Sequence, residues 1–201
     1  MGDCSGFSTS ARTNLDDEDG DIAPVQLVRA VAVAFGCLLR AQLPTNLHSA
    51  SSRFMDLSLA PAANSSDEES NESILEHRRE LEQLLDHLTC SFRLTSGCLI
   101  HAIILVERAM RAGVPFRAFS CRRLVLAALL LGSQAQIDEV ITVADFQCAL
   151  QETADRSIAA ELPSLQGALF VSVLDYHIDV SREMYDMYNT QLSSLSASLL
   201  K

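Results

Sequence analysis

Two consecutive segments of this chain are too apolar to lie on a protein surface, and they constrain the fold more than any other feature. Residues 96–111 carry apolar side chains around most of the circumference of a helix, and residues 120–134 contain the run LVLAALLLG. Gly113 can close the first helix, and Pro115 prevents its continuation. A helix that is apolar on all sides has to be buried between other elements. The sequence therefore predicts a helical bundle with these two helices at its centre.

An amphipathic helix is predicted ahead of the apolar pair. It starts near Ser73, whose hydroxyl can form a capping box with Glu76, three residues later. Its apolar stripe consists of leucines at helical spacing: Leu75, Leu81, Leu84, Leu85 and Leu88. A helix with one apolar stripe packs against the bundle and leaves its charged face in water.

Three more helices are predicted after the apolar pair. Thr142 can cap a short helix over residues 143–151, and Ser157 can cap a longer one that ends at Tyr176. Pro163 lies inside the longer helix and should kink it or delay its start. A last helix begins at Ser181, and its apolar side is formed by Met184, Tyr188, Leu192, Leu195 and Leu199. The folded part is therefore predicted to be all-α.

Composition divides the chain into four regions. Residues 1–22 are rich in Ser, Gly and acids, which predicts a disordered acidic tail. Residues 23–44 predict an accessory helix that begins near Pro24, with apolar positions Val25, Val28, Ala32, Phe35 and Leu39. Residues 45–72 are polar and acidic, which predicts a flexible linker, and residues 73–201 form the single folded domain.

The net charge is acidic and unevenly distributed. The 201 residues include 15 Lys and Arg against 26 Asp and Glu, which gives a formal net charge of -11. The acids gather in residues 3–21 and 67–82, whereas residues 95–201 are close to neutral. Because a nearly neutral domain offers no cationic face for phosphates, we expect no direct binding of nucleic acid.

The cysteines and the N-terminus indicate an intracellular protein, cytoplasmic, nuclear or both. The six cysteines form no C-x-x-C pair and lie mostly in apolar runs, so we expect them to be reduced. The start MGDCSGFSTS lacks the features of a secretory signal. It is either a disordered tail or an acylation site at Gly2 and Cys4 that would attach the chain to a membrane surface. The longest uncharged apolar run, residues 124–137, is too short to span a bilayer.

Sequence motifs of catalysis and of metal binding are absent. The sequence has no phosphate-binding glycine loop, no H-E-x-x-H and no G-x-S-x-G. The histidines do not have the spacing of metal ligands: His48, His77, His87, His101 and His177. His101 lies on a predicted buried helix, where we expect a hydrogen-bonded core residue. We therefore expect a binding or regulatory protein without enzyme activity, metal or cofactor.

Three helical segments follow one another in an order that a known family shares. LTSGCLIHAIILVERAM is similar to S-x-x-C-x-x-x-A-x-x-Y-I-x-R through Ser96, Ala102, Val106 and Arg108. FSCRRLVLAALLLGSQAQIDE is similar to L-N-x-H-R-L-L-L-T-A-L-L-L-A-A-K-F-x-D-D through Arg123, Leu124, Ala128, Leu129, Leu130, Leu131 and Asp138. ELPSLQGALFVSVLDYHIDVSREMYDMYNTQL resembles E-L-N-x-L-E-x-x-F-L-x-x-L-D-F-x-L-x-V-S-x-E-x-Y-x-x-Y, with one residue inserted near Val173. These patterns are those of the phosphate-regulon (P/U-type) cyclins, which the chain resembles from about residue 72 to 195.

The resemblance implies a single cyclin box of five helices, with an accessory helix before it and a trailing helix after it. It also implies binding to a cyclin-dependent protein kinase. In such cyclins a Lys on the third box helix and a Glu on the fifth pair with each other and bind the kinase backbone, and charge-assisted hydrogen bonds are about twice as strong as neutral ones.

The matching positions in this chain carry no charge. They are Gln134 and Gln166, or Gly167 if the inserted residue lies earlier. Ala135 stands where the family has an aromatic residue, and Phe170, one turn beyond Gln166, is either part of the partner surface or part of the core. Two hypotheses follow. The chain is a regulatory subunit that binds and activates or targets a kinase, or it is a degenerate cyclin-fold scaffold that binds other proteins without activating a kinase.

Overall fold

The computed structural model describes residues 24–41, 71–136, 141–151, 153 and 155–199. The predictions for the tail at residues 1–22, for the linker at residues 45–72 and for acylation at Gly2 and Cys4 lie outside the described residues. The side chain of Ser73 is also outside them, so its predicted cap stays a prediction.

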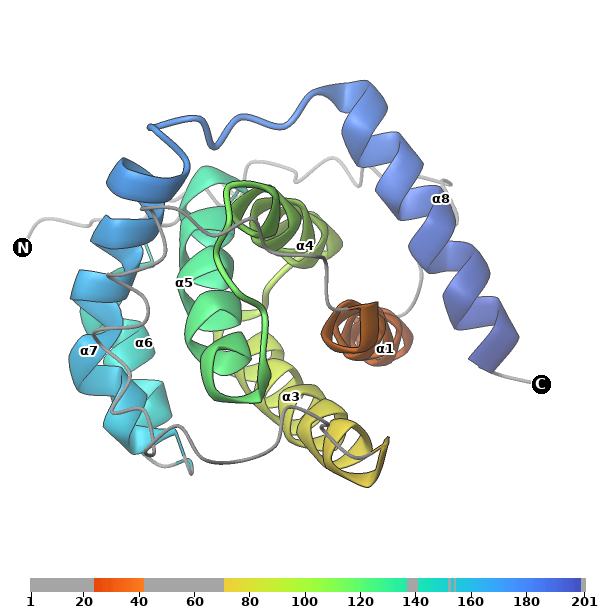
Figure 1. Ribbon diagram of the computed structural model, residues 1–201, viewed down its shortest axis with the longest axis horizontal. Coiled ribbons are helices and arrows are strands. Elements are labelled where there is room, and N and C mark those ends of the chain that lie inside the picture. Colours follow the sequence, from red (N-terminus) through yellow and green to blue (C-terminus); the bar gives the residue numbers. More distant parts are fainter. Residues whose placement is uncertain (1–23, 42–70, 137–140, 152, 154, 200–201) are drawn as a thin grey trace, which may run out of the picture.

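The described residues form helices and contain no strand, as predicted. Figure 1 shows α4 and α5 at the centre, α3 along one side, α6 and α7 on a second side, and α1 and α8 opposite them. The elements in chain order are α1 (Pro24–Ala41), α3 (Asn71–Phe92), α4 (Ser96–Arg111), α5 (Ala118–Gln136), α6 (Val143–Leu150), α7 (Arg156–Gly167), the π-helix η1 (Ala168–Val173) and α8 (Arg182–Leu199).

The two apolar helices pack against each other at the centre, which confirms the first prediction. Helix α4 has the predicted bounds, and α5 extends two residues beyond its predicted span at each end. Their backbones approach closely at Gly132, where an added Cβ would lie 3.1 Å from the carbonyl oxygen of Cys98 and 3.3 Å from the Cβ of His101. A side chain at Gly132 would therefore push α5 away from α4.

The predicted apolar stripe of α3 is correct except at its first position. Leu81, Leu84, Leu85 and Leu88 are buried, but Leu75 is 45% exposed and Ile74 is buried in its place. Successive residues are turned by about 100° around a helix, so Ile74 continues the buried stripe and Leu75 falls beside it.

Helix α1 packs into the common core rather than on its surface. It lies against α3, α4 and α8 (Figure 1). Phe35 is completely buried and its ring centroid lies 5.9 Å from that of Phe116. The predicted apolar position Val25 is wrong, because this residue of the first turn is 65% exposed and burial begins at Leu27.

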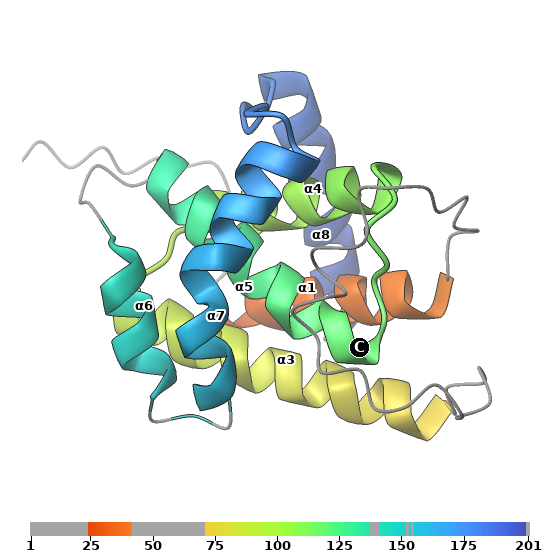
Figure 2. The same ribbon diagram turned by 60° about the vertical axis from the view of Figure 1, so that its left-hand side comes forward.

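Helices α6 and α7 lie side by side (Figure 2), and α7 packs against α5 while α6 contacts α3. Thr142 caps α6 as predicted, since its hydroxyl accepts from the backbone N–H of Asp145, and the Asp145 carboxylate accepts from the backbone N–H of Thr142. The prediction for α7 was wrong at its start. The helix begins at Arg156 with Asp155 at the N-cap position, so Pro163 does not delay it and Ser157 is not its cap.

The C-terminal end of the predicted long helix also differs from the prediction. The α-helix stops at Gly167, and η1 continues it as a wider turn. The backbone N–H of Leu174 donates to the carbonyl of Leu169, five residues back, at 2.9 Å. A π-helical turn holds one residue more than an α-helical turn. This turn lies where the resemblance required an inserted residue, near Val173.

Helix α8 closes the bundle on the far side of α1 (Figure 1). Ser181, predicted as the first residue of this helix, lies just before it and caps it, because its hydroxyl accepts from the backbone N–H of Met184 at 3.3 Å. Tyr188 and Leu192 of the predicted apolar side are buried, whereas Leu199 is 39% exposed at the C-terminal end of the helix.

Candidate functional site

The structure brings the two glutamines of the predicted site into direct contact. Gln134 lies in the last turn of α5 and Gln166 near the end of α7. The Nε2 of Gln166 donates to the Oε1 of Gln134 at 2.7 Å. The Nε2 of Gln134 in turn donates to the carbonyl oxygen of Ile141, just before α6, at 3.1 Å. The two amides therefore link the end of α5 both to α7, 32 residues away in sequence, and to the segment just before α6.

The other two predicted site residues are close to the pair along the chain. Ala135 is exposed and follows Gln134 directly. Phe170 is partly buried, one turn beyond Gln166, and packs at the edge of the apolar core. We call Gln134, Ala135, Gln166 and Phe170 the ledge.

Sequence reasoning missed Tyr176 as a neighbour of the ledge. Its ring meets that of Phe170 edge to face, with centroids 5.0 Å apart, and the residue is 60% exposed. Asp175 and Tyr176 both have left-handed backbones, with φ of 46° and 64°. Two consecutive non-glycine residues in this region are uncommon. The unexpected turn places Tyr176 against Phe170, and the inserted residue near Val173 was the one signal of it in the sequence.

A buried histidine supports the end of α5 from within. His101 is 3% exposed, and its Nε2 donates to the carbonyl of Ile178 at 2.6 Å. Its Nδ1 therefore accepts from the Nε2 of Gln136, the last residue of α5, at 3.1 Å. Burial lowers the pKa of the imidazole, and the hydrogen bond to the carbonyl of Ile178 opposes part of this shift. As predicted, His101 is a hydrogen-bonded core residue.

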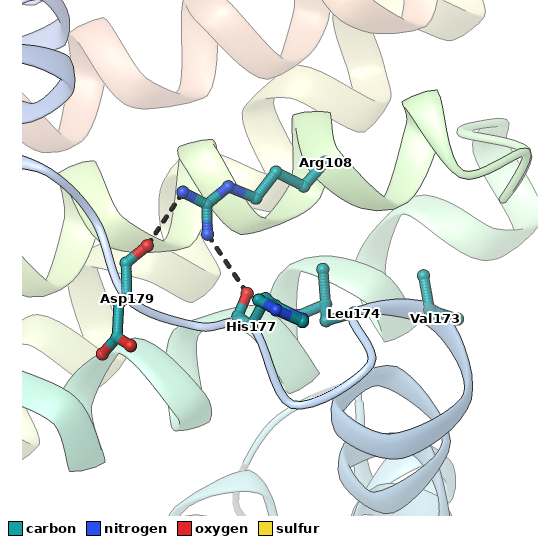
Figure 3. Close-up of a pocket in the computed structure, with 5 residues that line it drawn as sticks. All are labelled: Arg108, Val173, Leu174, His177 and Asp179. Atoms are coloured by element: carbon teal, nitrogen blue, oxygen red, sulfur yellow. Dashed lines mark hydrogen bonds between the residues drawn. The ribbon is translucent and has the colours of Figure 1, made fainter.

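Arg108 fastens the segment between η1 and α8 to the bundle. Its two terminal nitrogens donate to the carbonyl oxygens of His177, at 3.1 Å, and of Asp179, at 2.9 Å (Figure 3). A pocket of about 270 Å³ lies here, lined by Arg108, Val173, Leu174, His177 and Asp179. With His101, Arg108 binds three successive carbonyls from α4. We call residues 177–179 the strap.

Charged pairs hold the opposite end of α5. Arg122 donates to Asp155 at 2.8 Å and also pairs with Glu80 of α3. Burial lowers the pKa of Arg122, but Asp155 and Glu80 together raise it above its ordinary value. Arg123 pairs with Glu161 of α7 at 2.8 Å. These pairs fix α3 and α7 to α5, and so they help to set the position of Gln166 relative to Gln134.

The part of the chain that the structure describes holds neither a metal-ion cluster nor a membrane-crossing helix. No cluster of three or more His, Cys, Asp or Glu side chains there could hold a metal ion. Among the same residues, no helix combines the length and the apolar character needed to cross a membrane.

Comparison with known proteins gives a family but no individual relative. Neither the curated proteins nor the solved structures yield a match. The family model of the cyclin N-terminal domain matches residues 51–176, which is more than half of the chain and contains α3 to η1. The five helices α3 to α7 are the cyclin box, with α1 before it and α8 after it. The chain belongs to the cyclin N-terminal domain family.

Proposed function

We propose that this protein is a regulatory subunit that binds a cyclin-dependent protein kinase through the ledge and activates or targets it. We also propose that it is a divergent cyclin of the P/U type, because the three segment resemblances point to that group. Members of the cyclin family are typically regulatory proteins without catalytic activity of their own.

The observation that carries the proposal is the 2.7 Å contact between Gln134 and Gln166. In the cyclins that this chain resembles, the matching two positions hold the charged pair that binds the kinase backbone. In this chain two amides hold each other at hydrogen-bonding distance instead. The wider turn of η1 follows Gln166 in the chain, which supports Gln166 rather than Gly167 as the matching position.

Replacement of both charges is compatible with folding. Loss of one partner would leave a charge without its counter-ion, whereas loss of both leaves two amides that still donate and accept. We therefore expect the two amides to bind the kinase backbone more weakly than a charged pair does, since neutral hydrogen bonds have about half the strength of charge-assisted ones. Phe170 and the exposed ring of Tyr176 supply apolar contact area near the ledge, while Ala135 supplies almost none.

The weaker binding expected of an uncharged pair also supports a second candidate function. In this alternative the chain is a cyclin-fold scaffold that binds another protein and does not activate a kinase. The uncharged pair favours it, because activation requires a partner held in one fixed orientation.

The partners that the chain captures from cells distinguish the two candidate functions. The full chain is used to capture partners from cells, and the recovered complexes are assayed for phosphotransfer to a protein substrate. A cyclin-dependent kinase with stimulated phosphotransfer supports the proposal. Recovery of other partners, with no stimulation of any cyclin-dependent kinase, supports the scaffold.

A paired substitution then tests the surface. Gln134→Lys combined with Gln166→Glu restores the charged pair, and we expect it to bind the recovered kinase roughly tenfold more tightly, which corresponds to about 1.4 kcal/mol. Gln147→Met serves as a matched control, because Gln147 also donates through its side chain to a backbone carbonyl, that of Ala159, but lies on α6. A double variant that folds normally and binds no better than the control contradicts the assignment of the ledge.

A further inference from the structure

The guanidinium of Arg108 is in contact with neutral acceptors. Besides the two carbonyl oxygens of the strap, its Nη2 reaches the Sδ of Met184, in the first turn of α8, at 3.7 Å. The Asp179 carboxylate points away from the guanidinium in Figure 3. A thioether sulfur is a weak acceptor. A stronger acceptor placed where this sulfur lies would therefore find a charged donor already in position.

Oxidation of Met184 supplies such an acceptor. It converts the apolar thioether into a polar sulfoxide, whose oxygen is bonded directly to the sulfur. A hydrogen bond from a guanidinium to this oxygen has a charged donor, and hydrogen bonds with an ionised partner are roughly twice as strong as neutral ones. The sulfoxide of Met184 would join α8 to α4 more firmly than the thioether does.

The described methionines differ in access and in their neighbours. Met110 on α4 is buried, whereas Met187, further along α8, is 49% exposed. Among the described residues, no side chain forms a hydrogen bond with the sulfur of Met187. Met184 is partly exposed at the edge of the core, so a small oxidant can reach it. In the part of the chain that the structure describes, Met184 thus combines access with a cationic neighbour.

We propose that Met184 is a reversible oxidation site, and that Arg108 binds the oxygen of its sulfoxide. The oxidant is hydrogen peroxide. A lone pair of the sulfur attacks one peroxide oxygen, and the S–O bond forms as the O–O bond breaks. The departing hydroxide takes the proton of the transferred oxygen and leaves as water. The sulfur loses two electrons and the peroxide gains them, and a methionine sulfoxide reductase reverses the change with a thiol as the reductant.

Oxidation of Met184 should hold the strap more tightly to the bundle. Arg108 has to release two carbonyls before the strap can open, and a bond to the sulfoxide keeps the guanidinium in place. The strap amides report on this opening, because the N–H of His177 donates to the carbonyl of Leu174 at 2.8 Å and that of Ile178 to the carbonyl of Tyr176 at 3.1 Å. This inference goes beyond the proposed function and does not depend on kinase binding.

The test is treatment of the full chain with hydrogen peroxide, followed by peptide mass spectrometry and amide hydrogen exchange. Met187→Leu removes the more exposed methionine of α8, and Met184→Leu is the matched control. In Met187→Leu we expect oxidation of Met184 to slow exchange in the strap peptide by roughly three- to tenfold, and reductase treatment to restore the original rate. In Met184→Leu the same treatment should leave exchange in the strap unchanged. Arg108→Leu added to Met187→Leu removes the donor, so oxidation should no longer slow exchange.

Three results would overturn the inference. The first is faster or unchanged exchange in the strap after oxidation of Met184, because the sulfoxide oxygen then gains no bond that holds the strap. The second is a Met184 that stays reduced in the folded chain under conditions that oxidise Met187 completely. The third is slowing that persists in the variant with Arg108→Leu. Circular dichroism verifies that each variant is folded. None of these results affects the proposed function, which the capture experiment tests separately.

Discussion

Replacement of Arg122 should destabilise the protein, because it leaves the carboxylate of Asp155 buried without its ion-pair partner. The side chain of Asp155 is only 7% exposed, and Arg122 is its ion-pair partner at 2.8 Å. Arg122→Met keeps most of the apolar stem of the side chain and removes the charge. Breaking a buried ion pair from one side typically costs about 3–5 kcal/mol.

Two features of the structure reduce that figure. The Arg122 side chain is 22% exposed, so water compensates part of the loss. Asp155 also sits at the N-cap position of α7, where the helix dipole stabilises a carboxylate by about 0.3–1 kcal/mol. We therefore expect Arg122→Met to lower the free energy of unfolding by roughly 2–3 kcal/mol. Urea denaturation followed by circular dichroism measures the change directly.

Two further variants test the reasoning behind this magnitude. Glu80, the second partner of Arg122, has a side chain that is 39% exposed, so Glu80→Gln should cost less than about 1 kcal/mol. Asp155→Asn added to Arg122→Met removes the stranded charge and should recover part of the lost stability. The reasoning is refuted if Glu80→Gln destabilises as much as Arg122→Met, or if the double variant is no more stable than Arg122→Met alone.

Three other predictions concern the core and its buried polar groups. Phe35→Ala should cost about 3–5 kcal/mol in urea denaturation, while the exposed Val25→Ala should stay within about 0.5 kcal/mol; equal small effects would mean that α1 is not part of the folded core. The lowered pKa of His101 favours the neutral imidazole in the folded state. The free energy of unfolding should therefore be unaffected by this group above pH 6.5 and should decline as the pH falls below it. In His101→Gln this decline should be smaller. Burial, followed by a hydrogen bond to Glu107, raises the pKa of Tyr188 from 10.0 to about 12, so stability should fall as the pH rises through this interval, and Tyr188→Phe should abolish that part of the fall.

The core of the fold could be predicted because it depends on apolar pattern. Residues 96–111 were predicted with the bounds that α4 has, since Gly113 and Pro115 mark its end and the apolar circumference marks its interior. The errors occur where a pattern is ambiguous by one residue or lies at a helix end. Leu75 and Val25 are apolar residues near the starts of their helices, where helical spacing alone does not decide burial.

The pairing of Gln134 with Gln166 followed from the family resemblance and not from the residues alone. The two positions are far apart in sequence, and no local pattern predicts that two glutamine side chains meet. The hydrogen bonds that hold the end of α5 beside the ledge were not predicted. The bond between His101 and Gln136 joins α4 to the end of α5, and the bond to Ile178 depends on a strap that follows two left-handed residues. Such contacts depend on backbone turns that side-chain periodicity does not encode.

The most direct test of the central claim is amide hydrogen exchange of the full chain, free and bound to the recovered cyclin-dependent kinase. Binding through the ledge should slow exchange in the peptides that contain Gln134 and Gln166, and leave the exposed face of α8 unchanged. Slowed exchange confined to α1 and α8, with no change at the ends of α5 and α7, would contradict the claim that the ledge is the kinase-binding surface.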